Sequence, residues 1–98
     1  MTYFILKKYF KFLIDDYGFN ISFKQRMGFV QITYTNKKID ICILGEETIR
    51  ILISEAESYW YEDFTEYRDE FKTSGNYCKK AKAASQWLKE KLKKDYCL

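Results

Sequence analysis

Four stretches between residues 19 and 54 alternate apolar and polar side chains with a period of two. In an extended chain this alternation puts the apolar side chains of a stretch on one face, so each stretch is predicted to be a half-buried β-strand. The apolar positions are Phe19, Ile21 and Phe23, then Val30, Ile32 and Tyr34, then Ile39, Ile41 and Ile43, and finally Ile49, Ile51 and Ile53. Short connections at residues 27–28, 36–38 and 45–47 favour antiparallel hairpins over crossovers. The sequence therefore predicts a four-stranded antiparallel meander with one apolar face.

An apolar sheet face needs a cover, and three stretches have the three- to four-residue period of amphipathic helices. They are residues 2–17, which end before Gly18, residues 58–71, and residues 77–95. Four aromatic residues of the second stretch share one narrow arc of a helix and are assigned to the core, namely Trp60, Phe64, Tyr67 and Phe71. We expect a single α+β domain over residues 1–98, with an N-terminal helix and two C-terminal helices packed on one face of the meander.

The composition excludes several kinds of chemistry. The chain has no histidine, and its three cysteines, Cys42, Cys78 and Cys97, are widely spaced without a Cys-x-x-Cys pair. A zinc site therefore lacks ligands, and a Ser-His-Asp or Cys-His arrangement is impossible. None of the glycines belongs to a phosphate-binding loop pattern. We expect no catalytic residues, no metal and no cofactor, and hence a protein that is not an enzyme.

The chain also lacks the sequence features of membrane and exported proteins. Charged residues interrupt its apolar runs, so no stretch approaches the roughly 20 apolar residues that span a bilayer. The apolar N-terminal segment has lysines within its pattern and no small-residue cleavage site, which is atypical of a signal peptide. A cytoplasmic protein that does not bind membranes is expected.

Charge is strongly segregated along the chain. Residues 46–70 carry a net charge of −7, whereas the segments before and after them carry +4 and +6. Acids and tyrosines on one surface are typical of a site for a basic protein, since carboxylates speed association and tyrosines anchor it. The alternative is a solvated helix face that complements the basic last helix within the molecule. The candidate partner-binding residues are Tyr59, Tyr61, Glu62, Asp63, Glu66, Asp69 and Glu70.

A stripe of lysines on the last predicted helix is a second candidate surface. It consists of Lys79, Lys82, Lys89 and Lys93. Lysines that neutralise phosphates add salt-dependent affinity, so the stripe predicts nucleic-acid binding as an alternative function. However, no arginine follows Arg68 and only Trp87 offers a nearby ring for stacking. Solvated lysines, or an intramolecular match to the acidic stretch, also explain the stripe.

Four residues are out of place on the otherwise polar face of the meander, namely Phe29, Cys42, Leu44 and Leu52. Together they predict an apolar patch for a second copy of the chain or for another partner. Scattered apolar residues, or a strand register shifted by one residue, explain them without an interface. A homodimer is therefore one of the partner hypotheses.

The segment FLIDDYGF at residues 12–19, with the four alternating stretches and the acidic segment that follow, resembles small α+β immunity and antitoxin-like proteins of bacterial toxin–immunity loci. The likeness covers most of the chain in the order of its elements, and FLIDDYGF is its one local motif. It implies a compact cytoplasmic protein that neutralises a cognate toxin domain, through residues that vary from protein to protein. With the charge pattern, the resemblance predicts a non-enzymatic protein-binding module whose acidic, tyrosine-rich helix binds a basic toxin domain.

Overall fold

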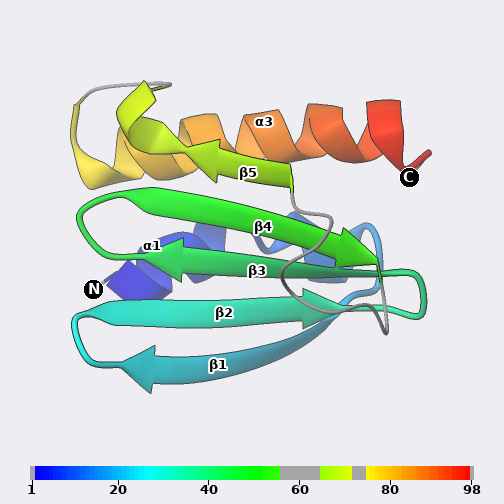
Figure 1. The fold of residues 1–98 in the computed structure, drawn as a ribbon, viewed down its shortest axis with the longest axis horizontal. Coiled ribbons are helices and arrows are strands. Elements are labelled where there is room, and N and C mark those ends of the chain that lie inside the picture. Colours follow the sequence, from blue (N-terminus) through cyan, green and yellow to red (C-terminus); the bar gives the residue numbers. More distant parts are fainter. Residues whose placement is uncertain (1, 56–64, 72–74, 98) are drawn as a thin grey trace.

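The computed structural model describes residues 2–55, 65–71 and 75–97. Its centre is an antiparallel sheet in which consecutive strands are neighbours throughout (Figure 1). The strands are β1 (Asn20–Arg26), β2 (Phe29–Thr35), β3 (Ile39–Gly45), β4 (Ile49–Glu55) and β5 (Thr65–Arg68). The predicted α+β class is confirmed, and so is the antiparallel meander formed by the four alternating stretches.

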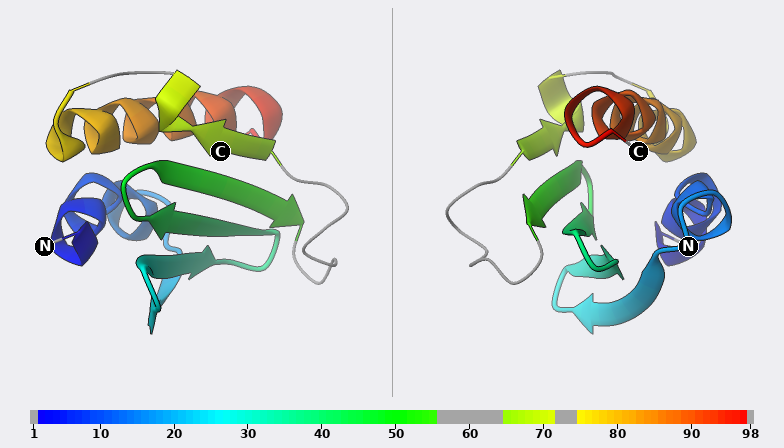
Figure 2. Two further views of the ribbon diagram at one scale, coloured as in Figure 1. Left: turned by 60° about the vertical axis from the view of Figure 1, so that its left-hand side comes forward. Right: turned by 90° about the vertical axis from the view of Figure 1, so that its right-hand side faces the viewer.

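Three helices cover one face of this sheet. They are α1 (Thr2–Tyr9), α2 (Phe12–Asp15) and α3 (Tyr77–Asp95). In the right-hand view of Figure 2, α1 and α3 both lie on the same side of the strands. The apolar residues of β2, β3 and β4 beneath them are buried: Val30, Ile32, Tyr34, Ile39, Ile41, Ile43, Ile49, Ile51 and Ile53. The helices therefore pack on one face, as the pattern predicts.

Helix α3 begins at a side-chain cap and packs partly through small residues. Asn76 accepts the backbone N–H of Lys79 at 2.9 Å, which satisfies one of the donors left free at a helix start. The residues buried beneath the helix are Ala81, Ala84, Ser85, Leu88 and Leu92. Three of these five side chains are small, so the helix axis can approach the sheet closely.

The predicted helix over residues 58–71 is wrong where the structure describes it. Residues 65–68 form β5 along β4, and η1 (Asp69–Phe71) is a short 3-10 turn. The sheet therefore has five strands rather than four, and α3 is the one C-terminal helix among the described residues. A strand is favoured here because it satisfies the backbone N–H and C=O groups that β4 would otherwise leave unpaired.

Of the four aromatic residues of this stretch that were predicted to be in the core, the structure describes the side chain of one, Tyr67. Tyr67 is buried, but it reaches the core from a strand that pairs it with Ile51. Its ring centroid lies 5.3 Å from that of Trp87 on α3. Trp60, Phe64 and the side chain of Phe71 lie outside the described part of the chain.

The predicted N-terminal helix is interrupted rather than continuous. Between α1 and α2, Leu13 donates its backbone N–H to the carbonyl of Phe10 at 3.1 Å, three residues back instead of four. This tight turn redirects the chain while Leu6, Phe10 and Leu13 all stay buried. Gly18 follows with a φ of 70°, the left-handed conformation in which helices commonly end at a glycine.

Burial of the first strand also differs from the prediction. All seven residues of β1 are exposed, although their alternation predicts a half-buried strand. The reason is its position, because β1 is the outermost strand while α1 packs on β3 and α3 on β4. On the sheet face away from the helices, several polar residues of the alternating stretches are half-buried: Gln31, Thr33, Thr35, Asp40 and Arg50.

Candidate functional site

The acidic surface predicted over residues 59–70 does not exist as a helix face in the described part of the chain. Tyr59, Tyr61, Glu62 and Asp63 lie outside the described residues. The remaining members are Glu66 on β5 and Asp69 and Glu70 in η1. Their environments decide how much negative charge they can offer a partner.

Glu66 is committed to contacts within the sheet. Its Oε1 accepts a hydrogen bond from Nε of Arg50 at 2.7 Å and lies 3.0 Å from Nη2 of Arg68. Arg68 also lies 4.0 Å from Glu70. Since both arginines share one carboxylate oxygen, the outer face of β4 and β5 is not the acidic surface that the composition suggests.

Asp69 is fully buried beneath α3. Its Oδ2 lies 3.9 Å from Nζ of Lys80, and neither carboxylate oxygen has a hydrogen-bond partner within the described ranges. Burial raises the pKa of the nearby Tyr77 hydroxyl, and the negative charges of Asp69 and Glu46 raise it further. Asp69 is therefore paired with the last helix within the molecule and is not accessible to a partner. It does not belong to the solvated helix face that was the alternative to partner binding, because it is buried in a 3-10 turn.

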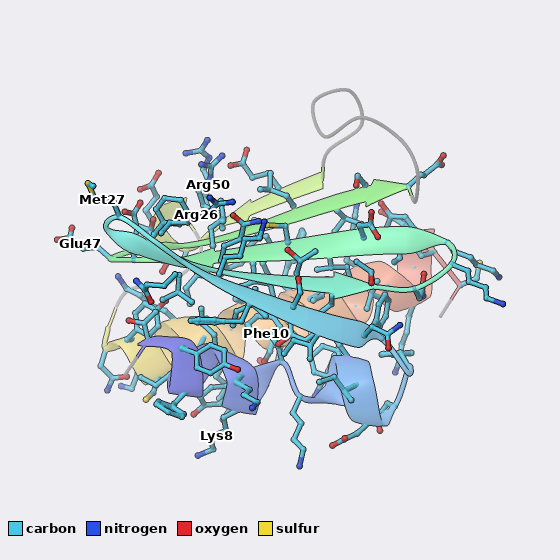
Figure 3. All side chains as sticks on the ribbon, turned by 90° about the horizontal axis from the view of Figure 1, so that it is seen from below. Lys8, Phe10, Arg26, Met27, Glu47 and Arg50 are labelled. Carbon is cyan, nitrogen blue, oxygen red and sulfur yellow. The ribbon has the colours of Figure 1, made fainter. Side chains whose placement is uncertain are left out.

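An open hollow of about 560 Å³ lies at the end of the sheet that carries the β1–β2 and β3–β4 turns. It is lined by Gly28, Glu46, Glu47, Thr48 and Glu70. In Figure 3, Met27 and Glu47 mark this end of the molecule. Three carboxylates here would attract cations, but no three acidic, histidine or cysteine side chains of the described residues converge as metal ligands.

The predicted lysine stripe is exposed as expected for a charged surface. Lys79, Lys82, Lys89 and Lys93 all reach solvent from α3. Among the described residues, the ion pairs of this helix involve the lysines beside the stripe, Lys80 with Asp69 and Lys91 with Asp95. Nζ of Lys89 lies 4.8 Å from the ring centroid of Phe12, so this member of the stripe is engaged by an aromatic ring while its charge stays unpaired by any described acid.

The predicted apolar patch on the outer sheet face offers little open surface. Cys42 is buried, and Phe29, Leu44 and Leu52 are half-buried. Burial raises the pKa of the Cys42 thiol, an effect that a hydrogen bond with Thr33 and the charge of Arg50 only partly oppose. The structure thus holds Cys42 as a neutral thiol within the sheet.

The most accessible apolar surface lies instead around β1. The large exposed apolar side chains of the described residues are Phe4, Ile21, Phe23 and Met27, at 69%, 37%, 36% and 98% exposure. Two of them belong to β1, one to the turn that follows it, and one to α1. Figure 3 looks onto this edge, with Arg26 and Arg50 pointing away from the helices and Phe10 lying between the sheet and the helical layer.

Aromatic contacts join this edge to the first helix. The ring of Phe23 lies edge-on to that of Tyr3, with centroids 4.0 Å apart, and Tyr3 lies 5.5 Å from Phe4. Nζ of Lys7 sits 5.5 Å from the centroid of Tyr3. The side of β1 that faces α1 is therefore apolar and aromatic, with a cation beside it.

The hydrogen-bond pattern of the described strands shows which backbone groups of β1 point away from β2. Asn36 donates its backbone N–H to the carbonyl of Ile39 at 3.1 Å, and hydrogen-bonded pairs alternate along an antiparallel ladder. Even-numbered residues of β2 therefore bond to β3, and odd-numbered residues bond to the even-numbered residues of β1. The N–H and C=O groups of Ile21, Phe23 and Gln25 consequently point to the open side of the sheet.

Sequence reasoning missed this edge because it treated all four alternating stretches alike. The topology contained the signal, since the first strand of a meander necessarily has one unpaired side. The basic residues Lys24 and Arg26, with no acid between residues 17 and 39, would also have marked the hairpin as distinct. Alternation alone reports which side chains share a face and cannot report whether anything covers that face.

Comparison with known protein families, with characterised proteins and with solved structures finds no match for this chain. Within the described ranges, no helix is long and apolar enough to span a membrane. The geometry of the chain itself is therefore the basis for the function proposed below.

Proposed function

We propose that this chain is a non-enzymatic protein-binding module that holds an extended segment of its partner against β1. The observation that carries the proposal is an edge strand of seven residues that are exposed throughout. A peptide that adds to a sheet edge gains affinity from backbone hydrogen bonds and specificity from alternate side chains. Ile21, Phe23 and Gln25 supply the donors and acceptors for such bonds.

A comparison of the two sheet edges supports this assignment. Strand β5 has four residues, and the element that follows it packs on α3. Strand β1 is longer, contains no proline, and pairs with β2 without a bulge. Soluble proteins commonly protect long edges with prolines, bulges, charged side chains or a covering segment, because open edges recruit other strands. Of these devices, the described residues give β1 only the charged side chains Lys24 and Arg26, which oppose a like-charged strand and leave the edge suited to a strand of opposite charge.

Capture of partners from lysate of the source cells tests the proposal when variants are compared. The double variant I21T/F23T removes the apolar contacts of the edge while keeping residues that favour strands. M27T is the matched control, since Met27 is an exposed apolar residue outside the strand. A partner that binds through β1 should be retained by the wild type and by M27T and lost by the double variant.

Hydrogen exchange of the captured complex supplies the second readout. The amides of Ile21, Phe23 and Gln25 should exchange rapidly in the free protein and slowly in the complex. Equal capture by I21T/F23T, or slowed exchange elsewhere with these three amides unchanged, would contradict strand addition.

The resemblance to immunity proteins suggests a toxin domain as the partner and the cytoplasm as the location. Tyr59, Tyr61, Glu62 and Asp63 are part of this hypothesis as a second contact for a basic toxin surface. Reversing Glu62 and Asp63 to lysine tests that contact without disturbing the Glu66 pairs. Unchanged affinity for the captured partner would remove these residues from the interface.

Nucleic-acid binding is the second candidate function, favoured by the exposure of the whole lysine stripe on α3. It predicts affinity for a DNA or RNA duplex that falls steeply as salt rises. Replacing Lys82 and Lys89 with glutamine should then weaken binding and flatten the salt dependence. No measurable binding in about 50 mM salt would end this alternative.

A further inference from the structure

We infer that the segment bound at β1 alternates apolar and acidic side chains, the apolar ones facing α1 and the acidic ones facing the opposite side. This inference rests on the proposed strand addition and names the chemistry of its partner. It follows from the different character of the two sides of β1.

The side of β1 toward α1 would receive apolar side chains. Ile21 and Phe23 project there, and both keep more than a third of their surface exposed. Tyr3 touches Phe23, and Phe4 continues the aromatic surface with most of its own ring exposed. A strand laid beside β1 places every second side chain on this side, close enough to contact the opposite and diagonal neighbours. Apolar residues at those positions would cover these rings.

The opposite side of β1 is polar and positively charged. Ser22, Lys24 and Arg26 project there and are exposed. Arg26 makes a long hydrogen bond to Gln31, 3.4 Å from Nε to Oε1, and no acid among the described residues forms an ion pair with it. Residues 17–39 hold four cations and no acid, the other two cations being Lys37 and Lys38. Acidic side chains of an added strand would therefore meet unopposed positive charge.

Charge also decides against a second copy of the chain as the occupant. The free backbone groups allow two β1 strands to pair antiparallel about Phe23, which sets Ser22 of each copy opposite Lys24 of the other. Lys24 of one copy would then be the diagonal neighbour of Lys24 of the other on the same side of the joined sheet. Diagonal neighbours are within reach of long side chains, so this contact between like charges disfavours the pairing. A segment with acids at these positions gains the same backbone bonds without that repulsion.

The geometry sets the length of the recognised segment. Three residues of β1 have outward backbone groups, and they span five positions from Ile21 to Gln25. A bound strand of at least five residues is needed to use all three. Three of its side chains, opposite Ile21, Phe23 and Gln25, would face α1, and the two opposite Ser22 and Lys24 would face the polar side.

Selection from a phage-displayed library of random nonapeptides tests the inference without a known partner. The immobilised targets are the wild type and the charge-reversed double variant K24E/R26E, with K37E/K38E as the control of equal charge change in a turn. Peptides enriched on the wild type should alternate apolar and acidic residues. Their affinity for K24E/R26E should drop roughly 2- to 30-fold, the range expected for two cross-strand charge pairs. K37E/K38E should bind them more nearly as the wild type does.

The same selection separates the two proposals. N-methylation of alternate residues of an enriched peptide blocks binding for one set of positions and spares the other when the peptide adds as a strand. Peptides that pass this test but carry no excess of acids would overturn the inference about charge and leave strand addition standing. Enriched peptides that do not perturb the amides of Ile21, Phe23 and Gln25 would overturn both.

Discussion

Arg50 on β4 and Glu66 on β5 form a close ion pair across the last two strands. Nε and Nη2 of Arg50 lie 2.7 and 2.6 Å from the same oxygen of Glu66. The carboxylate also separates Arg50 from Arg68, which the register places directly opposite each other. Glu66 thus holds a short strand in place and cancels a like-charge contact that would otherwise oppose the pairing.

Replacing Glu66 with glutamine should destabilise the fold modestly. Both side chains of the Arg50 pair are about a third exposed, so solvent screens the interaction, and we expect a loss of about 1 kcal/mol in urea unfolding. The loss should shrink in about 1 M salt, where the screening length is only about 3 Å. Glu90→Gln on α3 is the matched control for removing an exposed acid. Equal losses for the two variants would contradict a specific role for Glu66.

The chemistry of β5 explains why its prediction from sequence failed. A four-residue strand shows only two positions of a period-two pattern, whereas the aromatic residues of the longer stretch fit a helical arc. Tyr67 satisfies both patterns, because the same residue is buried in either conformation. What separates them is the unpaired edge of β4, which is a property of the folded sheet and not of residues 65–68.

The middle strands were predictable because each of them shows the alternating pattern over its full length. Each of β2, β3 and β4 also has a paired strand on both sides, so the pattern that predicts which of its faces is buried is sufficient to predict its environment. Strand β1 has the same pattern at Ile21 and Phe23 but lacks a neighbour on one side. The candidate site was missed because alternation predicts that a segment is a strand but does not predict whether that strand lies at the edge of the sheet.

Lys80→Met should be strongly destabilising because it leaves Asp69 without its cation. A buried charge that loses its partner typically costs several kcal/mol, and the 3.9 Å separation with a partly exposed lysine reduces this to about 2 kcal/mol. The further substitution Asp69→Asn removes the unmatched charge and should restore most of the loss. Urea unfolding of both single variants and the double variant measures this coupling. Additive effects would show that the two side chains do not interact.

The buried tyrosines predict a loss of stability in alkali. Burial raises the pKa of Tyr34, and the negative charge that Tyr3 carries when it is ionised raises it further. Burial followed by the charge of Asp69 does the same for Tyr67. Above about pH 10 the unfolded chain releases these protons while the folded chain retains them, so the free energy of unfolding falls as pH rises.

Tyr34→Phe isolates one of these groups. Its hydroxyl has no hydrogen-bond partner in the described part of the structure, so stability at pH 7 should be unchanged or higher by up to about 1 kcal/mol. The alkaline decline in unfolding free energy should become shallower than in the wild type. Parallel profiles for wild type and Tyr34→Phe would contradict the assignment.

A matched pair of isoleucines tests whether the apolar side chains of β1 serve partner binding more than they stabilise the core. Ile41 on β3 is fully buried and Ile21 on β1 is partly exposed, although both come from the same alternating pattern. Ile41→Ala should cost about 2–5 kcal/mol, and Ile21→Ala a smaller amount, about 1–2 kcal/mol. Only Ile21→Ala should weaken partner capture without unfolding the protein. Equal stability losses would mean that β1 contributes to the core as the other strands do.

Gly45 at the end of β3 lets α1 and α3 approach the sheet closely. A Cβ atom there would lie 2.5 Å from Cδ1 of Leu6 on α1 and 2.6 Å from Oη of Tyr77 on α3. Gly45→Ala should therefore lose about 1–3 kcal/mol of unfolding free energy through overpacking. Adding Tyr77→Phe removes one of the two close contacts and should recover part of the loss.

Gly18→Ala, with and without Tyr77→Phe, provides the control for the Gly45→Ala variants. Gly18 has a φ of 70° with no atom near its missing Cβ, so the substitution should cost about 1–2 kcal/mol through backbone conformation alone. Tyr77→Phe should not recover any of that loss, because the strain lies in the backbone and not in a side-chain contact. Rescue of both alanine variants, or of neither, would show that the space above Gly45 does not determine how closely α1 and α3 pack.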